Sequence, residues 1–344
     1  HTQAHTHTHT HTAPPSTVQR NSVLLCYVVA MASSSPWPSG EIARCTPMHL
    51  YNLLYWDIRI VDLRSAADYS RGHIKGSHNL PIESLDGASS EDTLKTHIER
   101  FERAVCAEWG TPEQQGDVVL LGGPSSSEDA GQDGSCDDAQ RVLTAVAECY
   151  LARNARVRRV HLLRGGYAAF AAAYACRCSA TSQDAGSDLL CYPSQISDRV
   201  FLGSSACRDP TVLSRLGIKR VIALMDEKPP PVDGVECFYV HLVDDERAQL
   251  VGTCLDQCLT LLATPFFSVS SADSPSSCAS SVPPRVLVHC ARGVSRSASV
   301  VIAHHMLTNR ICYDDALAYV RTCRAVVRPN AGFERQLREW QLGS

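Results

Sequence analysis

Short apolar runs separated by polar segments divide the chain into two groups of expected strands. In the first half these runs are Ile58–Leu63, Asp117–Leu121 and Val157–Leu163. In the second half they are Val200–Leu202, Arg220–Ala223, Cys237–Leu242 and Arg285–His289. Nearly continuous apolar runs are typical of strands covered on both faces, as in parallel sheets. The pattern therefore predicts an α/β protein with two domains, each containing a largely parallel sheet.

Helical periodicity fills the intervals between these strands. A helical region opens at Pro81–Leu85, and further helices are expected at Ser297–Asn309, Tyr313–Arg324 and Gly332–Gln341. Segments rich in Ser, Pro, Gly and Asp predict linkers or insertions at Ser33–Gly40, Gly122–Asp138, Ser179–Asp188 and Ser268–Pro284. We accordingly expect a disordered segment over residues 1–40, a first domain over 41–178, a linker over 179–190 and a second domain over 191–344, with a Ser/Pro-rich insertion at 268–284.

The first residues have the pattern of a translated nucleotide repeat. His and Thr alternate from His5 to Thr12, as a CACACA repeat would encode, and the chain begins without Met. We expect the segment before Met31 to be a non-native leader.

Charge and hydropathy exclude two classes of partner. The 344 residues carry a net charge of -4 and no long Lys/Arg block, so no nucleic-acid partner is expected. The apolar run Val23–Ala32 is too short to span a bilayer, and no membrane span is expected elsewhere. We expect a cytoplasmic protein, with the nucleus and mitochondria left open.

The 16 cysteines are scattered over a chain that has ample apolar residues for its cores. Reduced thiols fit this distribution better than a disulfide framework. The closest pairs, Cys176/Cys178 and Cys254/Cys258, lack a second Cys/His pair at zinc-finger spacing, so no metal site is expected.

The last expected strand leads into a helix through a stretch that combines a thiol, a glycine and an arginine. Its residues are His289, Cys290, Ala291, Arg292, Gly293, Val294, Ser295, Arg296 and Ser297. A loop that enters a helix presents free backbone N–H groups at the positive end of the helix dipole, which binds phosphate and favours a thiolate. We therefore expect residues 289–296 to bind a phosphate group.

Four side chains of this stretch have expected roles. Cys290 would attack phosphorus and form a phosphocysteine, and Arg296 would hold two phosphate oxygens with its planar guanidinium. Ser297 would donate a hydrogen bond to the sulfur as it leaves, and His289 would orient the loop. The backbone donors, Arg296 and Cys290, with Asp244 from a separate loop, would complete the reaction without a metal or another cofactor.

This stretch resembles the Cys-x5-Arg signature of the protein tyrosine phosphatase superfamily. Over Tyr192–Leu342 the chain resembles the dual-specificity phosphatases, including Val200-Phe201-Leu202-Gly203 and the run from Arg328 to Leu337. The resemblance implies hydrolysis of phosphotyrosine and phosphoserine/threonine in proteins, with Asp244 as the general acid. The adjacent Asp245 remains an alternative at this stage.

The first half resembles a rhodanese homology domain. The resemblance rests on Ile60-Val61-Asp62-Leu63-Arg64, Gly72-His73-Ile74-Lys75-Gly76 and Leu163-Arg164-Gly165-Gly166-Tyr167. Gly122-Gly123-Pro124-Ser125 follows the strand after which active rhodaneses carry Cys, so a regulatory or docking module is implied. The order of the two domains is that of the MAP kinase phosphatases, whose basic docking cluster is absent after Pro81. Phosphoprotein substrates are expected, and MAP kinases are left open among them.

Several residues are also similar to a class of catalytically silent relatives, the serine/threonine/tyrosine-interacting-like proteins. They are Pro47–Leu54, Arg164-Gly165-Gly166-Tyr167, Pro329-Asn330 and Glu339-Trp340. Known mammalian members lack the nucleophile, whereas Cys290 and Arg296 are both present here. The main hypothesis is thus an active phosphatase, and the alternative is an adaptor that binds phosphoproteins without efficient turnover.

Overall fold

The computed structural model describes residues 42–55, 58–81, 116–122, 144, 146–148, 151, 157–179, 190–264 and 284–342. The expected leader, nearly all of the linker over 179–190 and almost all of the insertion at 268–284 lie outside these residues. The same is true of the helical region expected after Pro81.

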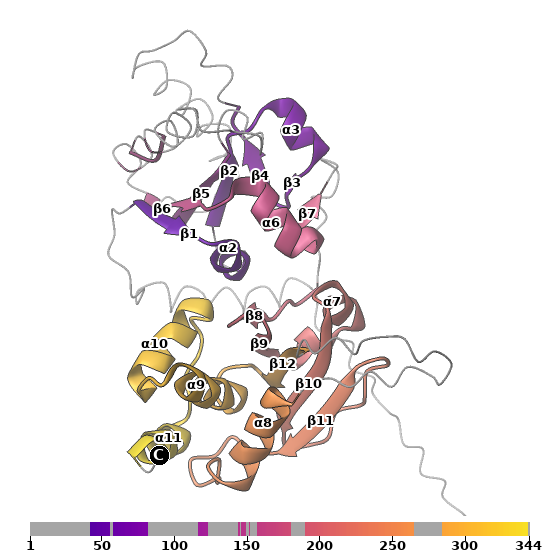
Figure 1. Ribbon diagram of the computed structural model, residues 1–344, viewed down its shortest axis with the longest axis vertical. Coiled ribbons are helices and arrows are strands. Elements are labelled where there is room, and N and C mark those ends of the chain that lie inside the picture. Colours follow the sequence, from indigo (N-terminus) through magenta and orange to yellow (C-terminus); the bar gives the residue numbers. More distant parts are fainter. Residues whose placement is uncertain are drawn as a thin grey trace, which may run out of the picture. The chain divides into compact units, whose positions relative to one another are not determined.

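The first sheet has five parallel strands in the order β1-β6-β5-β2-β4 (Figure 1). The strands are β1 (Ile42–Cys45), β2 (Ile58–Asp62), β4 (Ser77–Asn79), β5 (Gly116–Leu121) and β6 (Val157–Leu163). The helices described beside them are α2 (Pro47–Leu53), α3 (Ala66–Arg71) and α6 (Gly166–Tyr174), followed by the 3-10 turn η4 (Ala175–Arg177). Two short strands, β3 (His73–Ile74) and β7 (Cys178–Ser179), form an antiparallel pair. The three central strands are the ones that the sequence predicts.

Alternate side chains of the central strand β5 pack on opposite faces of this sheet. Val119 and Leu121 belong to the same apolar cluster as Phe170 of α6, whereas Val118 and Leu120 belong to a cluster with Ala147. Because side chains alternate along a strand, a strand that is covered on both faces tends to carry a nearly continuous run of apolar residues, as Val118–Leu121 do here. This explains the continuous run that marks the strand in the sequence.

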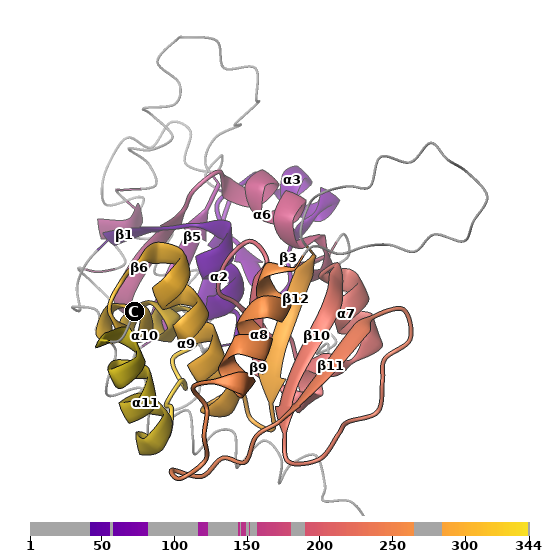
Figure 2. The ribbon, with the colours of Figure 1, turned by 60° about the horizontal axis from the view of Figure 1, so that its bottom comes forward.

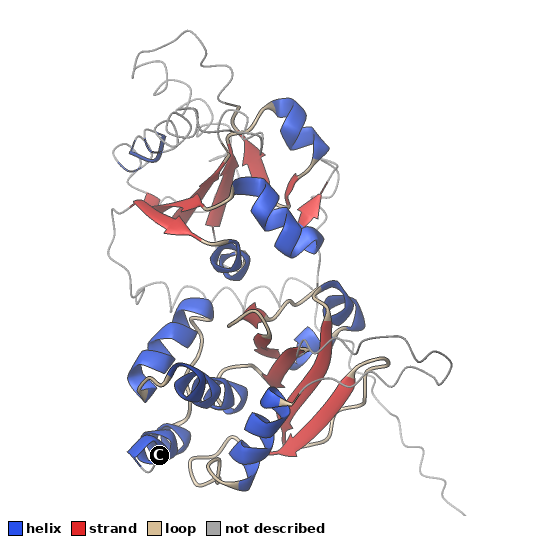
Figure 3. Ribbon diagram, viewed as in Figure 1, coloured by secondary structure: helices blue, strands red, loops and turns tan. Residues whose placement is uncertain are grey.

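The second sheet has the order β11-β10-β12-β9-β8 and is parallel except at β8, which runs antiparallel to β9. Its strands are β8 (Ser194–Gln195), β9 (Val200–Ser204), β10 (Ile218–Met225), β11 (Glu236–His241) and β12 (Arg285–Cys290). Its helices are η5 (Ser205–Arg208), α7 (Pro210–Arg215), α8 (Thr253–Ala263), α9 (Arg296–Asn309), α10 (Tyr313–Cys323) and α11 (Ala331–Leu342). Figure 3 shows the strands in red between helices in blue.

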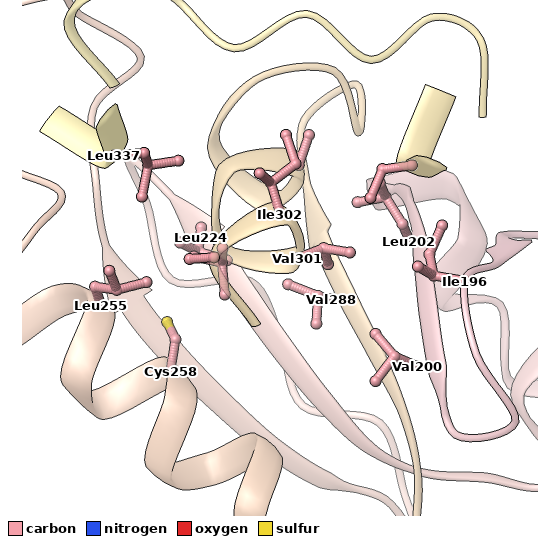
Figure 4. Packing of buried hydrophobic residues seen from close by; sticks show 14 of the residues in the cluster. Ile196, Val200, Leu202, Leu224, Leu255, Cys258, Val288, Val301, Ile302 and Leu337 are labelled. Carbon is pink, nitrogen blue, oxygen red and sulfur yellow. The ribbon is translucent and has the colours of Figure 1, made fainter. Parts of the chain in front are cut away.

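Helices cover both faces of the second sheet, and the core on one face is the larger. Figure 2 shows α8 and α9 in front of the sheet, and Figure 4 shows Val301 and Ile302 of α9 close to Val288 of β12. On the other face Leu287 clusters with Val212 of α7. Burying each such aliphatic side chain contributes about 1.5–3 kcal/mol relative to exposure. The strand β12, which ends at Cys290, is thus held from both sides.

The described residues between Ile42 and Leu342 fall in one compact unit, and the segment before β9 hydrogen-bonds to α2. The Asn52 side chain donates Nδ2 to the carbonyl oxygen of Gln195 and accepts from its amide, both at 2.8 Å. The Tyr174 hydroxyl donates to Oε1 of Gln195 at 2.6 Å. These bonds satisfy both backbone groups of Gln195, which is buried.

Within the described ranges, every helix is too short or too polar to cross a membrane.

Candidate active site

The phosphate-binding stretch lies at the carboxyl end of β12, where the chain turns into α9. Cys290 is the last residue of β12, and Arg296 is the first residue of α9. Gly293 has a φ of 68°, and a Cβ at this position would overlap the carbonyl oxygen of Gly203 on the adjacent strand β9. Only glycine fits both the left-handed backbone and this close approach.

The carbonyl oxygens of residues 291–294 each accept a hydrogen bond from a residue outside the loop. Ala291 accepts from the Ser205 amide at 3.3 Å, and Val294 accepts from the Arg328 amide at 2.9 Å. Arg324 donates through Nε to the carbonyl of Gly293 at 2.9 Å and through Nη2 to the carbonyl of Arg292 at 3.1 Å. With its carbonyls held outward, the loop leaves its N–H groups to converge on an anion.

The Cys290 thiol is buried and is a hydrogen-bond acceptor. The amide of Gly293 donates to its Sγ at 3.2 Å, and the Ser297 hydroxyl donates at 3.3 Å. Burial is the strongest influence on the Cys290 pKa and raises it, but hydrogen bonds from Ser297, Val294 and Gly293 outweigh burial and lower the pKa below its ordinary value. The structure therefore favours a thiolate at this position.

His289 is fully buried beside Cys290 and is neutral. Burial lowers its pKa to about 4, and its Nδ1 lies 3.3 Å from the carbonyl oxygen of Cys290. A carbonyl oxygen can only accept, so Nδ1 carries the ring proton. The ring thereby holds the backbone carbonyl of Cys290, and it does not contact the sulfur in any hydrogen bond described.

The Arg296 guanidinium lies at the carboxyl ends of three neighbouring strands. Its Nη1 donates to Asp226 Oδ1 at 2.9 Å and to the Leu242 carbonyl at 3.1 Å. Its Nε is buried and has no hydrogen-bond partner among the described residues. A buried guanidinium N–H of this kind is available to a bound phosphate. Sequence reasoning missed Asp226, although a carboxylate immediately after a strand, at the same sheet edge as the motif, was a usable signal.

Of the two adjacent carboxylates that the sequence left open, Asp244 reaches the loop. Its Oδ1 accepts from the Ser295 hydroxyl at 2.7 Å and from Asn330 Nδ2 at 3.0 Å, and its Oδ2 lies 3.9 Å from Arg296 Nε. Asp245 instead accepts from the amide of Arg247 at 2.8 Å, which closes a local turn. Ser295 was expected to bind phosphate as part of residues 289–296, and its hydroxyl also holds Asp244.

Asn330 is a site residue that sequence reasoning did not single out. Its Oδ1 accepts from the Phe333 amide at 2.9 Å, which caps the start of α11 and leaves Nδ2 as the group that donates to Asp244. Its own amide donates to the Ser295 hydroxyl at 3.1 Å. Asn before a helix is a recognisable cap signal, but the cap does not reveal which carboxylate the remaining N–H group reaches.

Within the described part of the first domain, the strand end that carries the nucleophile in active rhodaneses has no thiol. β5 ends at Leu121, and Gly122 follows with a φ of 93° beside Arg64. Across the described ranges no group of three or more His, Cys, Asp or Glu residues could hold a metal ion.

Comparison with known proteins agrees with both halves of this description. Residues 200–342 match the model of the dual specificity phosphatase catalytic domain, and residues 46–173 match that of the rhodanese-like domain. Dual specificity protein phosphatase 1 from Homo sapiens is 26% identical over 312 residues, which cover 82% of this chain and 77% of that protein. Dual specificity protein phosphatase 8 from Mus musculus is 25% identical over 293 residues, covering 82% and 41%.

Similar solved structures include human DUSP28 and the human tyrosine phosphatase-like serine/threonine/tyrosine-interacting protein. Each is 25% identical with a TM-score of 0.36, and each covers 44% of this chain. The matches cover 96% and 95% of those chains, respectively. The two family models and the curated relatives confirm the resemblances found in the sequence: the chain carries a rhodanese-like domain followed by the catalytic domain of a dual specificity phosphatase.

Proposed function

We propose that the chain is a cysteine-dependent protein phosphatase that hydrolyses phosphotyrosine and phosphoserine/threonine. The observation that carries this proposal is the Cys290 sulfur, which accepts hydrogen bonds from Gly293 and Ser297 inside a loop whose carbonyls are bound on the outside. The match to the dual specificity phosphatase catalytic domain supports it.

In the first step the Cys290 thiolate attacks phosphorus, and the bond between phosphorus and the substrate oxygen breaks. Asp244, in its acid form, gives its proton to the leaving oxygen. Arg296 and the loop amides bind the equatorial phosphate oxygens, where negative charge is held in the transition state. The products of this step are a free hydroxyl group on the protein substrate and a phosphocysteine.

In the second step water attacks the phosphocysteine, and the Asp244 carboxylate takes a proton from that water. The S–P bond breaks, the electron pair returns to the Cys290 sulfur, and inorganic phosphate leaves. The Ser297 hydroxyl, 3.3 Å from Sγ, stabilises the departing thiolate by its hydrogen bond.

Phosphoproteins are the proposed substrates because the curated relatives are named as dual specificity protein phosphatases. The rhodanese-like domain is proposed as a docking or regulatory module, since Gly122 follows β5 where a sulfurtransferase would need its nucleophile. The segment after Pro81, where the MAP kinase phosphatases carry a basic docking cluster, lies outside the described residues. The proposal therefore names phosphoproteins as substrates and does not specify MAP kinases among them.

Turnover of an aryl phosphate by the full-length chain tests the proposal. Cys290→Ser should lower kcat by about 10⁴-fold or more, because a neutral hydroxyl replaces the thiolate nucleophile. Arg296→Lys should also lower kcat strongly, because a single ammonium cannot replace the planar fork. Cys237→Ser, which changes an exposed cysteine on β11, is the matched control and should leave turnover unchanged.

Acid quench of the unmutated enzyme during turnover should trap a phosphorus-labelled peptide that contains Cys290. Equal turnover by Cys290→Ser and by the unmutated protein would overturn the mechanism. Tight capture of phosphoproteins by the unmutated chain, without release of phosphate, would favour the adaptor alternative instead.

A further inference from the structure

Two cysteines outside the proposed mechanism form a close pair behind the phosphate-binding loop. The sulfur atoms of Cys191 and Cys207 are 3.5 Å apart. The Ser204 hydroxyl lies 3.8 Å from the first sulfur and 3.7 Å from the second. Cys207 lies in η5 and is 1% exposed, whereas Cys191, just before β8, is partly exposed.

This thiol pair is connected to the loop through the end of β9. A Cβ at Gly203 would lie 2.7 Å from Cys207 Sγ, so the sulfur rests directly on the backbone of this strand. The carbonyl of the same glycine is the group that a Cβ at Gly293 would overlap. The next residue, Ser204, is paired with Cys290 in the parallel register of β9 and β12. The pair therefore contacts the end of β9, and the end of β9 in turn contacts the loop.

The two thiols are chemically unequal. A hydrogen bond from Cys207 lowers the pKa of Cys191 to about 6, against the effect of burial, and Ser204 adds to the lowering. The same hydrogen bond, together with burial, raises the pKa of Cys207 well above its ordinary value. Near neutral pH the pair thus consists of a partly exposed thiolate and a buried thiol, the combination that reacts with an oxidant and then closes.

We propose that Cys191 and Cys207 form a reversible disulfide when a hydroperoxide reacts with the chain, and that this bond weakens the phosphate-binding loop. The Cys191 thiolate attacks one peroxide oxygen, the O–O bond breaks, and a sulfenic acid forms as hydroxide leaves. The Cys207 sulfur then attacks the sulfenic sulfur and loses its proton, the S–O bond breaks, and hydroxide leaves to form water. Overall, two thiols and one hydrogen peroxide give one disulfide and two waters.

Closing the bond requires movement at a tightly packed place. A disulfide bond is about 2.05 Å long, so the two sulfurs must approach by roughly 1.5 Å. Because Cys207 rests on Gly203, this movement is transmitted to the strand end against which Gly293 packs. A misplacement of about 1 Å in a catalytic array costs on the order of 100-fold in rate. We expect oxidation of the pair to lower kcat/KM by about 10-fold or more, and a thiol reductant to restore it.

The disulfide is tested first without any need for activity. The full-length Cys290→Ser protein is treated with hydrogen peroxide at a small molar excess, free thiols are alkylated, and the digest is analysed by mass spectrometry. A reductant-sensitive peptide that joins Cys191 to Cys207 is expected. Separate alkylation of both residues after peroxide treatment, or linkage of either one to a different cysteine as the main product, would overturn the proposal.

The effect on the loop is tested on the unmutated chain, and this part rests on the proposed phosphatase function. Peroxide is added while inorganic phosphate occupies the loop and shields Cys290, both are removed, and aryl phosphate turnover is measured. The unmutated chain should lose about 10-fold or more in kcat/KM, reversibly. Cys191→Ser should start at normal turnover and keep it after peroxide.

Equal inactivation of Cys191→Ser and the unmutated chain would assign the loss to another residue and reject the switch. If no variant turns over an aryl phosphate at all, the phosphatase proposal fails. In that event inorganic phosphate binding by the Cys290→Ser protein, measured by calorimetry before and after oxidation, replaces turnover as the readout. Unchanged phosphate affinity after complete linkage would contradict the coupling to the loop.

Discussion

At Cys290 two opposing effects act on one sulfur atom. Its burial opposes a negative charge, whereas donors from Gly293 and Ser297 favour it, and the donors prevail. The chain supplies these donors from its own backbone and from a serine one residue after the arginine, and they lower the pKa of Cys290 below its ordinary value. His289, neutral with a pKa of about 4, contributes by holding the backbone of Cys290.

Ser297→Ala should raise the pKa of Cys290, because the thiolate loses a hydroxyl donor at 3.3 Å. The pH dependence of alkylation by iodoacetate measures this, and its midpoint should move to higher pH. Loss of a hydrogen bond to a charged group costs about 1.5–3 kcal/mol, which corresponds to about 10- to 100-fold in the rate of the step in which the thiolate leaves.

Ser299→Ala is the matched control for this substitution. Ser299 is also buried in α9, but its hydroxyl donates to the Ser295 carbonyl at 2.9 Å and has no hydrogen bond to the nucleophile. Its alkylation midpoint should stay with that of the unmutated chain. An unchanged midpoint in Ser297→Ala would show that the backbone donors alone lower the pKa of Cys290.

At the scale of elements, α11 holds the loop that carries the proposed general acid. Asn330 donates to Asp244 at the start of the helix, and Gln336 accepts from the amides of Leu250 and Val251 at 2.8 and 3.1 Å. A Cβ at Gly332 would overlap the backbone of Glu246. Two positions of α11 and the residue that caps it thus hold this loop at both ends, so that Asp244 lies beside Ser295 and Arg296 without a bound substrate.

Asn330→Ala should affect substrates according to their leaving group. The variant removes one hydrogen bond that holds the Asp244 carboxyl group in place. We therefore expect slower proton transfer to the leaving group and unchanged attack by Cys290. General acid catalysis is worth about 10²–10⁴-fold, so we expect kcat for phenyl phosphate to fall by about 10-fold. The rate with 2,4-dinitrophenyl phosphate, whose leaving group needs no proton, should change by less than about twofold.

Arg338→Ala provides the control on the same helix. Its guanidinium forms ion pairs with Asp314 and Glu334 and has no described bond to the acid loop, so both rates should match those of the unmutated chain. Equal losses with the two substrates in Asn330→Ala would mean that the substitution acts on the fold and not on the acid.

At the scale of the whole molecule, stability depends on a buried carboxylate of the first domain. Asp117 of β5 is 5% exposed and lies against Arg158 at 2.9 Å and His161 at 3.2 Å on β6. Burial raises its pKa, but the His161 and Arg158 hydrogen bonds prevail and lower it from 3.8 to about 2. The folded state therefore holds the charged form more firmly than the unfolded chain does.

The sign of the pH dependence follows from this lowered pKa. The stabilisation is fully present above the ordinary value of 3.8 and is lost as the pH falls toward 2. Asp117→Asn should lower the free energy of unfolding at pH 7 by about 2 kcal/mol, and the deficit should shrink as the pH falls from about 5 to 2. Urea unfolding across this range measures both effects. A deficit that stays constant from pH 7 to pH 2 would contradict the argument.

The apolar pattern alone predicted most of the framework. The central strands of both sheets and the helices α9, α10 and α11 appear within a few residues of their expected bounds. Strands covered on both faces can be predicted because they form nearly continuous apolar runs in the sequence. β1, β4 and β8 were not predicted, because they are short strands at the edges of the sheets, one of them only Ser194–Gln195.

By itself the sequence determined the α/β fold class and the family of each half, and it predicted that the stretch from His289 to Ser297 binds phosphate. These features are local, because the periodicity of a strand and the pattern of a loop entering a helix each occupy one continuous stretch of sequence. Only the tertiary structure decided that Asp244 and not Asp245 meets the loop, that Asp226 and Asn330 join the site, and that Cys191 lies against Cys207. Those contacts join residues from different strands and helices, and such distances exist only after the sheet has set the order of its strands.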